Sequence, residues 1–265
     1  MKKNAFRVGI FDSGIGGLTV LDECRRRLPC LQYYYYGDNQ RAPYGGRSEE
    51  EILSFTKEAL DYFVKIRADA VVLACNTATA AAVSELRRMY ALPIIGMEPA
   101  VKPAAQSCKK VLVIATQRTI ESARLKVLVE RFPGCEFTLA ACPHLAFAIE
   151  KYYTEGESFL LSAHLPEGKF DGVVLGCSHY SFFARQIARY YSAPTFDGNA
   201  GTAKRLKTVL ERKGSVSLAH QESTQKQNIC FSFKGKGGVK FVGKSRKINK
   251  QIYFRTFVLG KTKKK

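Results

Sequence analysis

Two heptapeptides 102 positions apart decide the fold of this chain: Asp69-Ala70-Val71-Val72-Leu73-Ala74-Cys75 and Asp171-Gly172-Val173-Val174-Leu175-Gly176-Cys177. They share five identities in seven positions, and each is a short apolar run that ends in a cysteine. Such a run is typical of a buried strand. A repeat of this period is too long for a solenoid unit and indicates a duplicated domain.

Landmarks around the heptapeptides keep nearly the same spacing. The strand entering Asp12 aligns with the strand entering Ala115, 103 positions later, and Pro93 aligns with Pro194, 101 positions later. Short apolar runs alternate with amphipathic stretches, which is typical of βαβ units around a parallel sheet. We expect strands at residues 7–11, 32–36, 70–74, 93–96, 110–115, 136–140, 172–176 and 194–196.

The predicted fold class is α/β: two pseudo-symmetric three-layer α/β domains with mainly parallel sheets and the active site in the cleft between them. Functional loops of such domains lie at the carboxyl ends of the strands. Domains that face each other therefore bring Cys75 and Cys177 to one cleft from opposite sides. We place the hinges near residues 98–101 and 197–202, so residues 1–98 with 202–265 form the first domain and residues 99–201 the second.

Composition narrows the class of protein. Hydrophobic residues make up 46% of the 265 positions, and the apolar run near the N-terminus ends at Asp12, too short for a secretory or membrane segment. We expect a cytoplasmic protein that does not bind membranes. Its eight cysteines lack the spacing of a disulfide framework and should stay reduced. No zinc-ligand spacing is present, so no metal is expected.

The net charge of +19 is concentrated near the C-terminal end of the chain. Fourteen of the 42 Lys and Arg residues lie from Lys213 onwards, against one acid, Glu222. Such a run is usually a solvated surface, and this one carries no nucleic-acid recognition motif. Nucleic acid is kept as an accessory partner of this basic tail. The alternative to an enzyme is a protein whose main role is to bind nucleic acid through this tail. This alternative predicts salt-dependent DNA binding.

The matched cysteines suit racemisation of an amino acid. This reaction removes the α-proton from one face and delivers a proton to the other, so it needs a base and an acid on opposite sides of the carbon. Cys75 precedes an expected helix at residues 77–90, and Cys177 precedes one at residues 182–191. A helix N-terminus favours the thiolate form of a cysteine and so lowers the pKa of its thiol. A cysteine without such a match is usually packed and inert, and we assign that role to Cys24, Cys30, Cys108, Cys135, Cys142 and Cys230.

Polar residues beside the thiols are candidates for holding the substrate. Asn76 and Thr77 follow one cysteine, and Ser178 and His179 follow the other. N–H groups at a helix start bind carboxylates. His179 lies two positions after Cys177, so we expect it to take part in proton transfer or to orient the sulfur.

Two glycine-bearing loops are further candidates. The loop at residues 12–17 follows a strand but lacks dinucleotide-binding spacing, and the Asp12 carboxylate would oppose a pyrophosphate. Asp12 and Ser13 suit a substrate ammonium group better, and Asp12 is also expected to adjust the nearby thiol. In the turn-rich loop at residues 37–47, backbone N–H groups of Tyr44 and Gly45 are expected to face the substrate, although an ordinary surface turn is the alternative.

At these residues the sequence resembles the glutamate racemase family. The matching segments are residues 11–20, 36–38 with 43–45, 74–78 and 175–180, in the family's order. The resemblance implies that Cys75 and Cys177 interconvert L- and D-glutamate without pyridoxal phosphate or another cofactor, assisted by Asp12 and His179, to supply D-glutamate for peptidoglycan. It also implies substrate contacts at Asp12, Ser13, Tyr44, Gly45, Asn76, Thr77, Ser178 and His179, with further site residues at Thr116, Thr119 and Glu150.

The sequence itself allows more than one substrate and more than one reaction. The choice of glutamate over aspartate or another small acid rests on the resemblance, because one methylene of substrate length is set by cleft geometry. A decarboxylase of the same superfamily is the other enzyme alternative. The paired cysteines argue against it, because a decarboxylase could protonate its product from one face with a single thiol. We expect a homodimer, and the residues after Lys213 do not resemble the usual end of the family.

Overall fold

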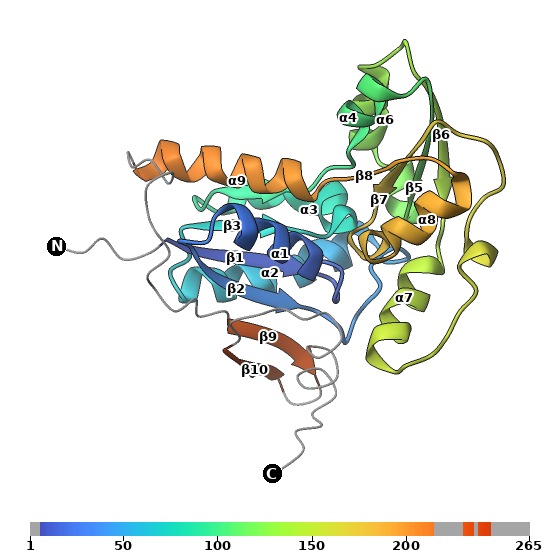
Figure 1. Ribbon diagram of the computed structural model, residues 1–265. Helices are drawn as coiled ribbons and strands as arrows, with labels where there is room; N and C mark the ends of the chain where they lie inside the picture. The colour runs from blue at the N-terminus through green and yellow to red at the C-terminus, as the bar shows by residue number, and fades with distance from the viewer. Residues whose placement is uncertain (1–5, 215–229, 236–237, 245–265) are drawn as a thin grey trace.

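The computed structural model describes residues 6–214, 230–235 and 238–244. These residues form two sheets, which Figure 1 shows side by side. The first sheet has the strand order β10-β9-β2-β1-β3-β4, and the second has the order β6-β5-β7-β8. Apart from β9 and β10, the two orders are the same, so the predicted pair of α/β halves with mainly parallel sheets is confirmed.

The first eight strands begin and end within one residue of their predicted positions. Strand β1 lies between β2 and β3, with Phe11 opposite both Tyr36 and Leu73, and β5 lies between β6 and β7, with Ile114 opposite Leu175. The strands are β1 (Arg7–Asp12), β2 (Gln32–Gly37), β3 (Ala70–Leu73), β4 (Ile94–Gly96), β5 (Lys110–Ala115), β6 (Glu136–Ala141), β7 (Gly172–Gly176) and β8 (Thr195–Asp197).

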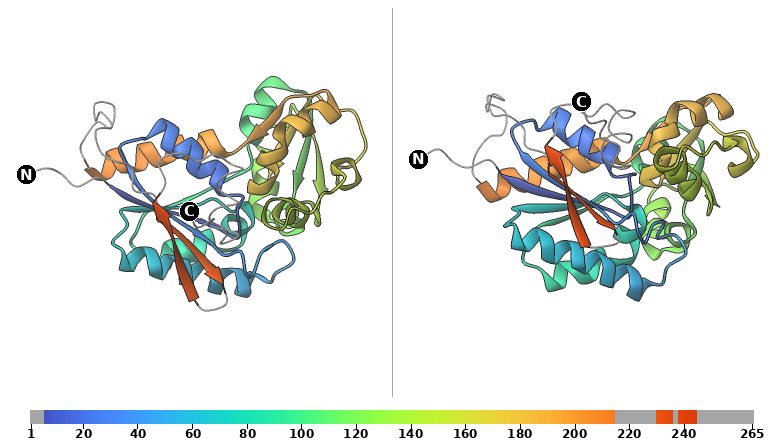
Figure 2. Two further views of the ribbon diagram at one scale, coloured as in Figure 1. Left: turned by 60° about the horizontal axis from the view of Figure 1, so that its bottom comes forward. Right: turned by 90° about the horizontal axis from the view of Figure 1, so that it is seen from below.

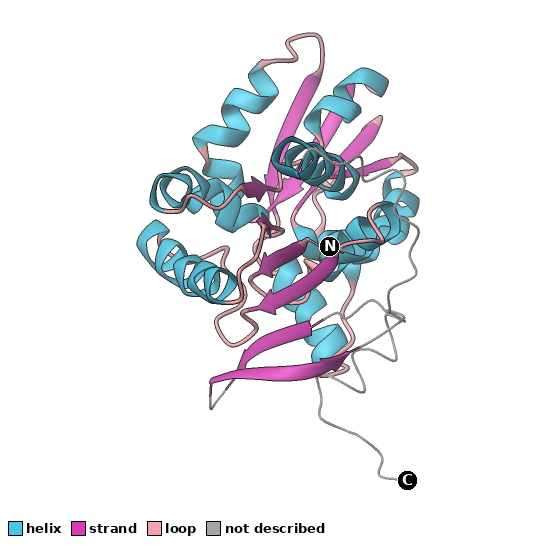
Figure 3. Ribbon diagram, turned by 90° about the vertical axis from the view of Figure 1, so that its left-hand side faces the viewer, coloured by secondary structure: helices cyan, strands magenta, loops and turns pink. Residues whose placement is uncertain are grey.

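Helices cover both faces of each sheet, as Figure 3 shows. In the first half, α1 (Leu18–Arg27) and α9 (Asn199–Gly214) share one core with the sheet, and α2 (Glu49–Lys65) and α3 (Asn76–Met89) share the other. In the second half, α7 (Leu145–Thr154) and α8 (Ala184–Tyr191) cover one face, and α4 (Val101–Ser107) and α6 (Ala123–Glu130) cover the other. Shorter helices are α5 (Gln117–Glu121), η1 (Leu161–His164) and η2 (Ser178–Phe183).

Local sequence explains these elements. Strands β3 and β7 are buried at every residue, because helices cover both faces of a parallel sheet, and such strands therefore read as continuous apolar runs. Helix α2 begins with a capping box: the Ser48 hydroxyl accepts a hydrogen bond from the Glu51 N–H at 3.2 Å, and the Glu51 carboxylate accepts one from the Ser48 N–H at 3.0 Å.

The chain crosses between the halves twice, from β4 to α4 and from β8 to α9. The two crossings touch, since a Cβ on Gly198 would lie 2.4 Å from the carbonyl oxygen of Glu98. Only glycine allows this close approach of backbone to backbone. After the second crossing, α9 returns along the first half (Figure 1), where Ala203, Leu206 and Leu210 join the core.

Two further strands extend the first sheet at its β2 edge (Figure 2). Strand β9 (Cys230–Gly235) runs parallel to β2, and β10 (Gly238–Lys244) runs antiparallel to β9. The rest of the basic tail, including Glu222, lies outside the described residues. No helix in the described parts of the chain is long and apolar enough to cross a membrane.

We expect Leu206→Ala to lower the free energy of unfolding by about 2–5 kcal/mol, because it removes a fully buried side chain that joins α9 to the first core. Urea unfolding followed by circular dichroism measures the loss. The matched control is Leu160→Ala, at a side chain that is 70% exposed, and it should change stability by less than about 0.5 kcal/mol. Equal stability of the two variants would contradict the assignment of α9 to this core.

Candidate active site

Cys75 lies at the junction of β3 and α3 and is buried. Its sulfur accepts a hydrogen bond from the Ala78 backbone N–H at 3.4 Å and lies 3.4 Å from the Ser13 hydroxyl oxygen. The sheet explains this contact, because β1 pairs with β3 and the loop after β1 therefore meets the end of β3. The predicted helix after Cys75 is present, and it begins at Asn76.

The start of this helix does not lower the pKa of Cys75. Burial raises the pKa to about 11, with a further increase from the charge of Asp12, and together they outweigh the hydrogen bonds from Ser13 and Ala78. The prediction of a lowered pKa is therefore wrong for this thiol. The sequence shows that a helix begins here, but it does not show that the sulfur is fully enclosed beside a carboxylate.

Cys177 directly follows β7 in the corresponding position, but the element that comes after it differs from the prediction. The 3₁₀ helix η2 begins directly at Ser178, and α8 begins only at Ala184, where a single helix over residues 182–191 was expected. The Cys177 sulfur is buried and lies 3.9 Å from Nδ1 of His179. An imidazole is therefore a close polar neighbour of this thiol.

A buried hydrogen bond joins the two halves between the cysteines. The Ser178 hydroxyl donates to Oδ2 of Asp12 at 2.8 Å, and the Gly14 N–H donates to Oδ1 at 2.9 Å. Burial raises the pKa of Asp12, although the charge of His179 and these hydrogen bonds oppose the increase. Ser178 directly follows Cys177, and Asp12 directly precedes the serine that contacts Cys75, so this hydrogen bond joins the two chain segments beside the thiols.

Glu150 of α7 holds His179 in place. Nε2 of His179 lies 2.6 Å from the Glu150 carboxylate, which also accepts hydrogen bonds from the Ile15 N–H at 3.2 Å and from the Asn39 amide at 2.5 Å. Burial alone would lower the pKa of His179, but its hydrogen bonds to Cys177 and Glu150 and the charge of Glu150 raise it well above the usual value. An imidazolium therefore lies beside Cys177 at neutral pH.

Three threonines form another link between the halves. Oγ1 of Thr77 lies 2.8 Å from Oγ1 of Thr116, which in turn donates to Thr119 at 3.1 Å. Gly45 lies against this group, since a Cβ there would be 3.1 Å from Cβ of Thr116. Tyr44 is buried, and its hydroxyl donates to a carboxylate of its own loop at 2.5 Å. The structure thus places the loop at residues 37–47 against the second half.

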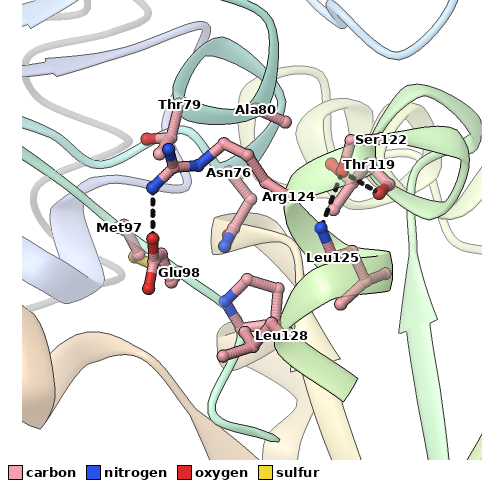
Figure 4. Close-up of a pocket in the computed structure, with 11 residues that line it drawn as sticks. Asn76, Thr79, Ala80, Met97, Glu98, Thr119, Ser122, Arg124, Leu125 and Leu128 are labelled. Atoms are coloured by element: carbon pink, nitrogen blue, oxygen red, sulfur yellow. Dashed lines mark hydrogen bonds and ion pairs between the residues drawn. The ribbon is translucent and has the colours of Figure 1, made fainter. Parts of the chain in front are cut away.

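Asn76 is the predicted site residue that the structure leaves without a link to the others. Its side chain is buried, and neither amide atom has a hydrogen-bond partner within the described part of the chain. Figure 4 shows it in a pocket that Thr119 also lines, where Arg124 forms an ion pair with Glu98. An unpaired buried polar group costs about 1–3 kcal/mol. The Asn76 amide is therefore suited to the polar group of a ligand.

Asn39 and the Ile15 N–H support Glu150, although neither is among the predicted site residues. Both belong to the two glycine-bearing loops, but Asn39 and Glu150 are 111 positions apart, and no pattern in the sequence pairs them. Within residues 6–214 and the two added strands, no group of three His, Cys, Asp or Glu side chains could hold a metal ion.

Comparison with known proteins identifies the family of the chain. A family model described as Asp/Glu/Hydantoin racemase matches residues 18–206. The chain belongs to this racemase family. A glutamate racemase of Campylobacter concisus is 41% identical to it over 244 residues, which cover 86% of this chain and 90% of the relative.

Solved structures of this racemase family share the fold. The glutamate racemase isoform RacE1 of Bacillus anthracis superposes with a TM-score of 0.72 at 30% identity, covering 88% of this chain and 90% of that chain. The glutamate racemase of Escherichia coli, solved with L-glutamate and the activator UDP-MurNAc-ala, also gives a TM-score of 0.72 at 30% identity. The match covers 85% of this chain and 88% of that chain.

We expect Gly16→Ala to reduce the racemase activity about 100-fold, because small displacements of reacting groups cost about this much. A Cβ at position 16 would lie 2.4 Å from Oγ of Ser178 and 2.7 Å from the backbone nitrogen of His179, so the two halves would have to separate. The control is Gly201→Ala, whose Cβ would meet no atom within 4 Å. Racemisation rates measure the effect, and an undiminished rate for Gly16→Ala would show that the contact is dispensable.

Proposed function

We propose that this chain is a glutamate racemase that interconverts L- and D-glutamate by proton transfer at Cys75 and Cys177 and supplies D-glutamate for peptidoglycan synthesis. The hydrogen bond between Ser178 and Asp12 carries the proposal, because it joins the residue after Cys177 to the residue before Ser13, which contacts Cys75. Relatives named glutamate racemase, 41% and 37% identical over most of the chain, support the choice of substrate. So does the similar Escherichia coli enzyme, which was solved with L-glutamate.

In the proposed reaction, one thiolate removes the α-proton and the opposite thiol delivers a proton to the other face. The electron pair of the broken C–H bond remains on the α-carbon until the new C–H bond forms. Only protons move, so no cofactor is needed in this scheme. The two sulfurs exchange roles when the direction reverses.

The groups around each sulfur suggest whether it starts the reaction as a thiolate or as a thiol. A cationic His179 3.9 Å from Cys177 resembles the cysteine–histidine pairs that activate nucleophiles, and Glu150 keeps the imidazole in place. Cys75, with a pKa of about 11, is protonated at neutral pH and is the acid when Cys177 is the base. In the other direction, a substrate ammonium group beside Asp12 would offset the carboxylate charge that raises the pKa of Cys75.

We assign the remaining candidates to substrate binding. Asp12 and Ser13 would bind the ammonium group, the N–H groups of Tyr44 and Gly45 would bind a carboxylate, and Asn76 would bind through its unpaired amide. The remaining members of the set already have hydrogen-bond partners: Thr77 bonds Thr116 across the halves, Thr116 bonds Thr119, and Ser178 bonds Asp12. They would exchange these partners for substrate oxygens, at little net cost per hydrogen bond.

The domain boundaries are part of this proposal: residues 1–98 with 202–265, and residues 99–201. The two sheets and the return of α9 to the first core support them. The homodimer and the cytoplasmic location stay predictions. Nucleic-acid binding by the basic tail also stays a prediction, because most of that tail lies outside the described residues.

The substrate can be tested by circular dichroism of amino-acid solutions. The protein should remove the signal of L-glutamate and of D-glutamate, reaching the racemic mixture from either side. L-aspartate should react at least about tenfold more slowly, because one methylene changes transition-state binding by about 1–3 kcal/mol. Turnover of aspartate alone would replace glutamate as the substrate, and no turnover of either would refute the proposed function.

Substitution of each thiol tests the mechanism. Cys75→Ser and Cys177→Ser should each reduce racemisation by about 100-fold to 10,000-fold, the usual contribution of a general acid or base. Exchange of the α-proton with deuterated solvent should continue from one enantiomer in each variant, and from opposite enantiomers in the two. Cys135→Ser, at a partly exposed cysteine whose sulfur donates to the Glu136 carbonyl oxygen, is the control. Near-native racemisation in either active-site variant would rule out opposed thiol catalysis.

A further inference from the structure

A cavity of about 480 Å³ opens where the two halves meet. Its lining includes Gly45 and Arg47 from the loop of the first half, and Thr116 and Arg118 from the start of α5 in the second half. Gly45 and Thr116 are also members of the proposed substrate site. This cavity is therefore the outer end of that site, and we refer to it as the cleft mouth.

Arg118 crosses the cleft mouth. Its Nη2 donates a hydrogen bond of 3.0 Å to the carbonyl oxygen of Arg47, which joins the two halves at their outer edge. Its Nε is buried, and no described residue accepts a hydrogen bond from it. A guanidinium is always charged and cannot accept hydrogen bonds. Nε is thus a donor that an anion entering the cleft mouth could satisfy.

The charged residues that line the cleft mouth are mainly basic. Two arginines, Arg47 and Arg118, share the lining with one acid, Glu121. Glu51 forms an ion pair with Arg47 at 3.3 Å and offsets part of its charge. Within the described part of the chain, by contrast, Arg118 forms no ion pair; its charge helps to lower the pKa of the exposed Glu50, and its side chain lines the cavity.

We propose that Arg118 is a positioning residue of the racemase, which draws the anionic substrate into the cleft mouth and, through the Arg47 carbonyl, holds the halves together over it. The inference rests on the proposed function in one respect, that the substrate carries two carboxylates and one ammonium group. A basic cleft raises the local concentration of such an anion and its rate of association. Because Arg118 lies at the entrance and not beside the thiols, its effect belongs to binding more than to proton transfer.

Two variants separate the charge of Arg118 from its shape. Arg118→Gln removes the charge, and we expect it to raise KM for both glutamate enantiomers about tenfold while kcat changes less than about threefold. The decrease of kcat/KM with added salt should also become weaker. Arg118→Lys keeps the charge and should restore the salt dependence, with a smaller rise in KM because the guanidinium fork is lost. Initial rates at low and high ionic strength measure all of these quantities.

The matched control is Arg131→Gln, which removes an exposed arginine at the end of α6 and should leave KM and salt dependence unchanged. Native KM and native salt dependence in Arg118→Gln would overturn the proposal. A fall in kcat at unchanged KM would also overturn it, since Arg118 would then affect the chemical step. Thermal unfolding of each variant detects loss of the fold, and Arg118→Lys keeps the test valid if Arg118→Gln is unstable. Absence of racemisation in the unaltered protein would refute the proposed function instead.

Discussion

A hydroxyl group of one half bonds a buried carboxylate of the other, and the geometry of the site depends on this contact. Asp12 ends β1, and Ser178 follows β7, so the hydrogen bond between them joins the carboxyl ends of the two sheets. A carboxylate without solvent is costly unless its oxygens are satisfied, and here Gly14 and Ser178 satisfy one oxygen each. Separating the halves would remove the bond from Ser178. The contact that keeps Asp12 satisfied therefore also joins the two chain segments that carry the thiols.

The repeated backbone carries unequal chemistry at its two equivalent positions. Cys75 lies near Asp12, whose negative charge adds to the effect of burial and raises the pKa of the thiol. Cys177 lies beside His179, which Glu150 keeps charged. The duplicated fold thus places the two cysteines at equivalent positions. Residues outside the repeated heptapeptides give the two thiols different surroundings. A substrate with both positive and negative groups is suited to reduce this difference, because it changes the charge beside each sulfur.

The sequence predicts the fold well and the site in part, for physical reasons. Buried parallel strands are continuous apolar runs, and the repeated heptapeptide makes β3 the counterpart of β7, so the strand positions and the duplication follow from pattern, whereas the strand order comes from the structure. The pKa of Cys75 does not, because it depends on enclosure and on a carboxylate from another loop. The bond of Asn39 to Glu150 and that of Arg118 to Arg47 join residues 111 and 71 positions apart. Loop residues such as these show no period that would pair them.

The contact between Gly198 and the Glu98 carbonyl constrains how the halves can move. The two backbone segments are packed so closely here that one can turn about the other, but sliding would bring their atoms into a clash. If the angle between the halves changes, we therefore expect a rotation about this pivot and not a sliding motion. In a rotation, groups move in proportion to their distance from the pivot. A molecule bound at the outer rim therefore affects the angle between the halves more than one bound beside the crossings.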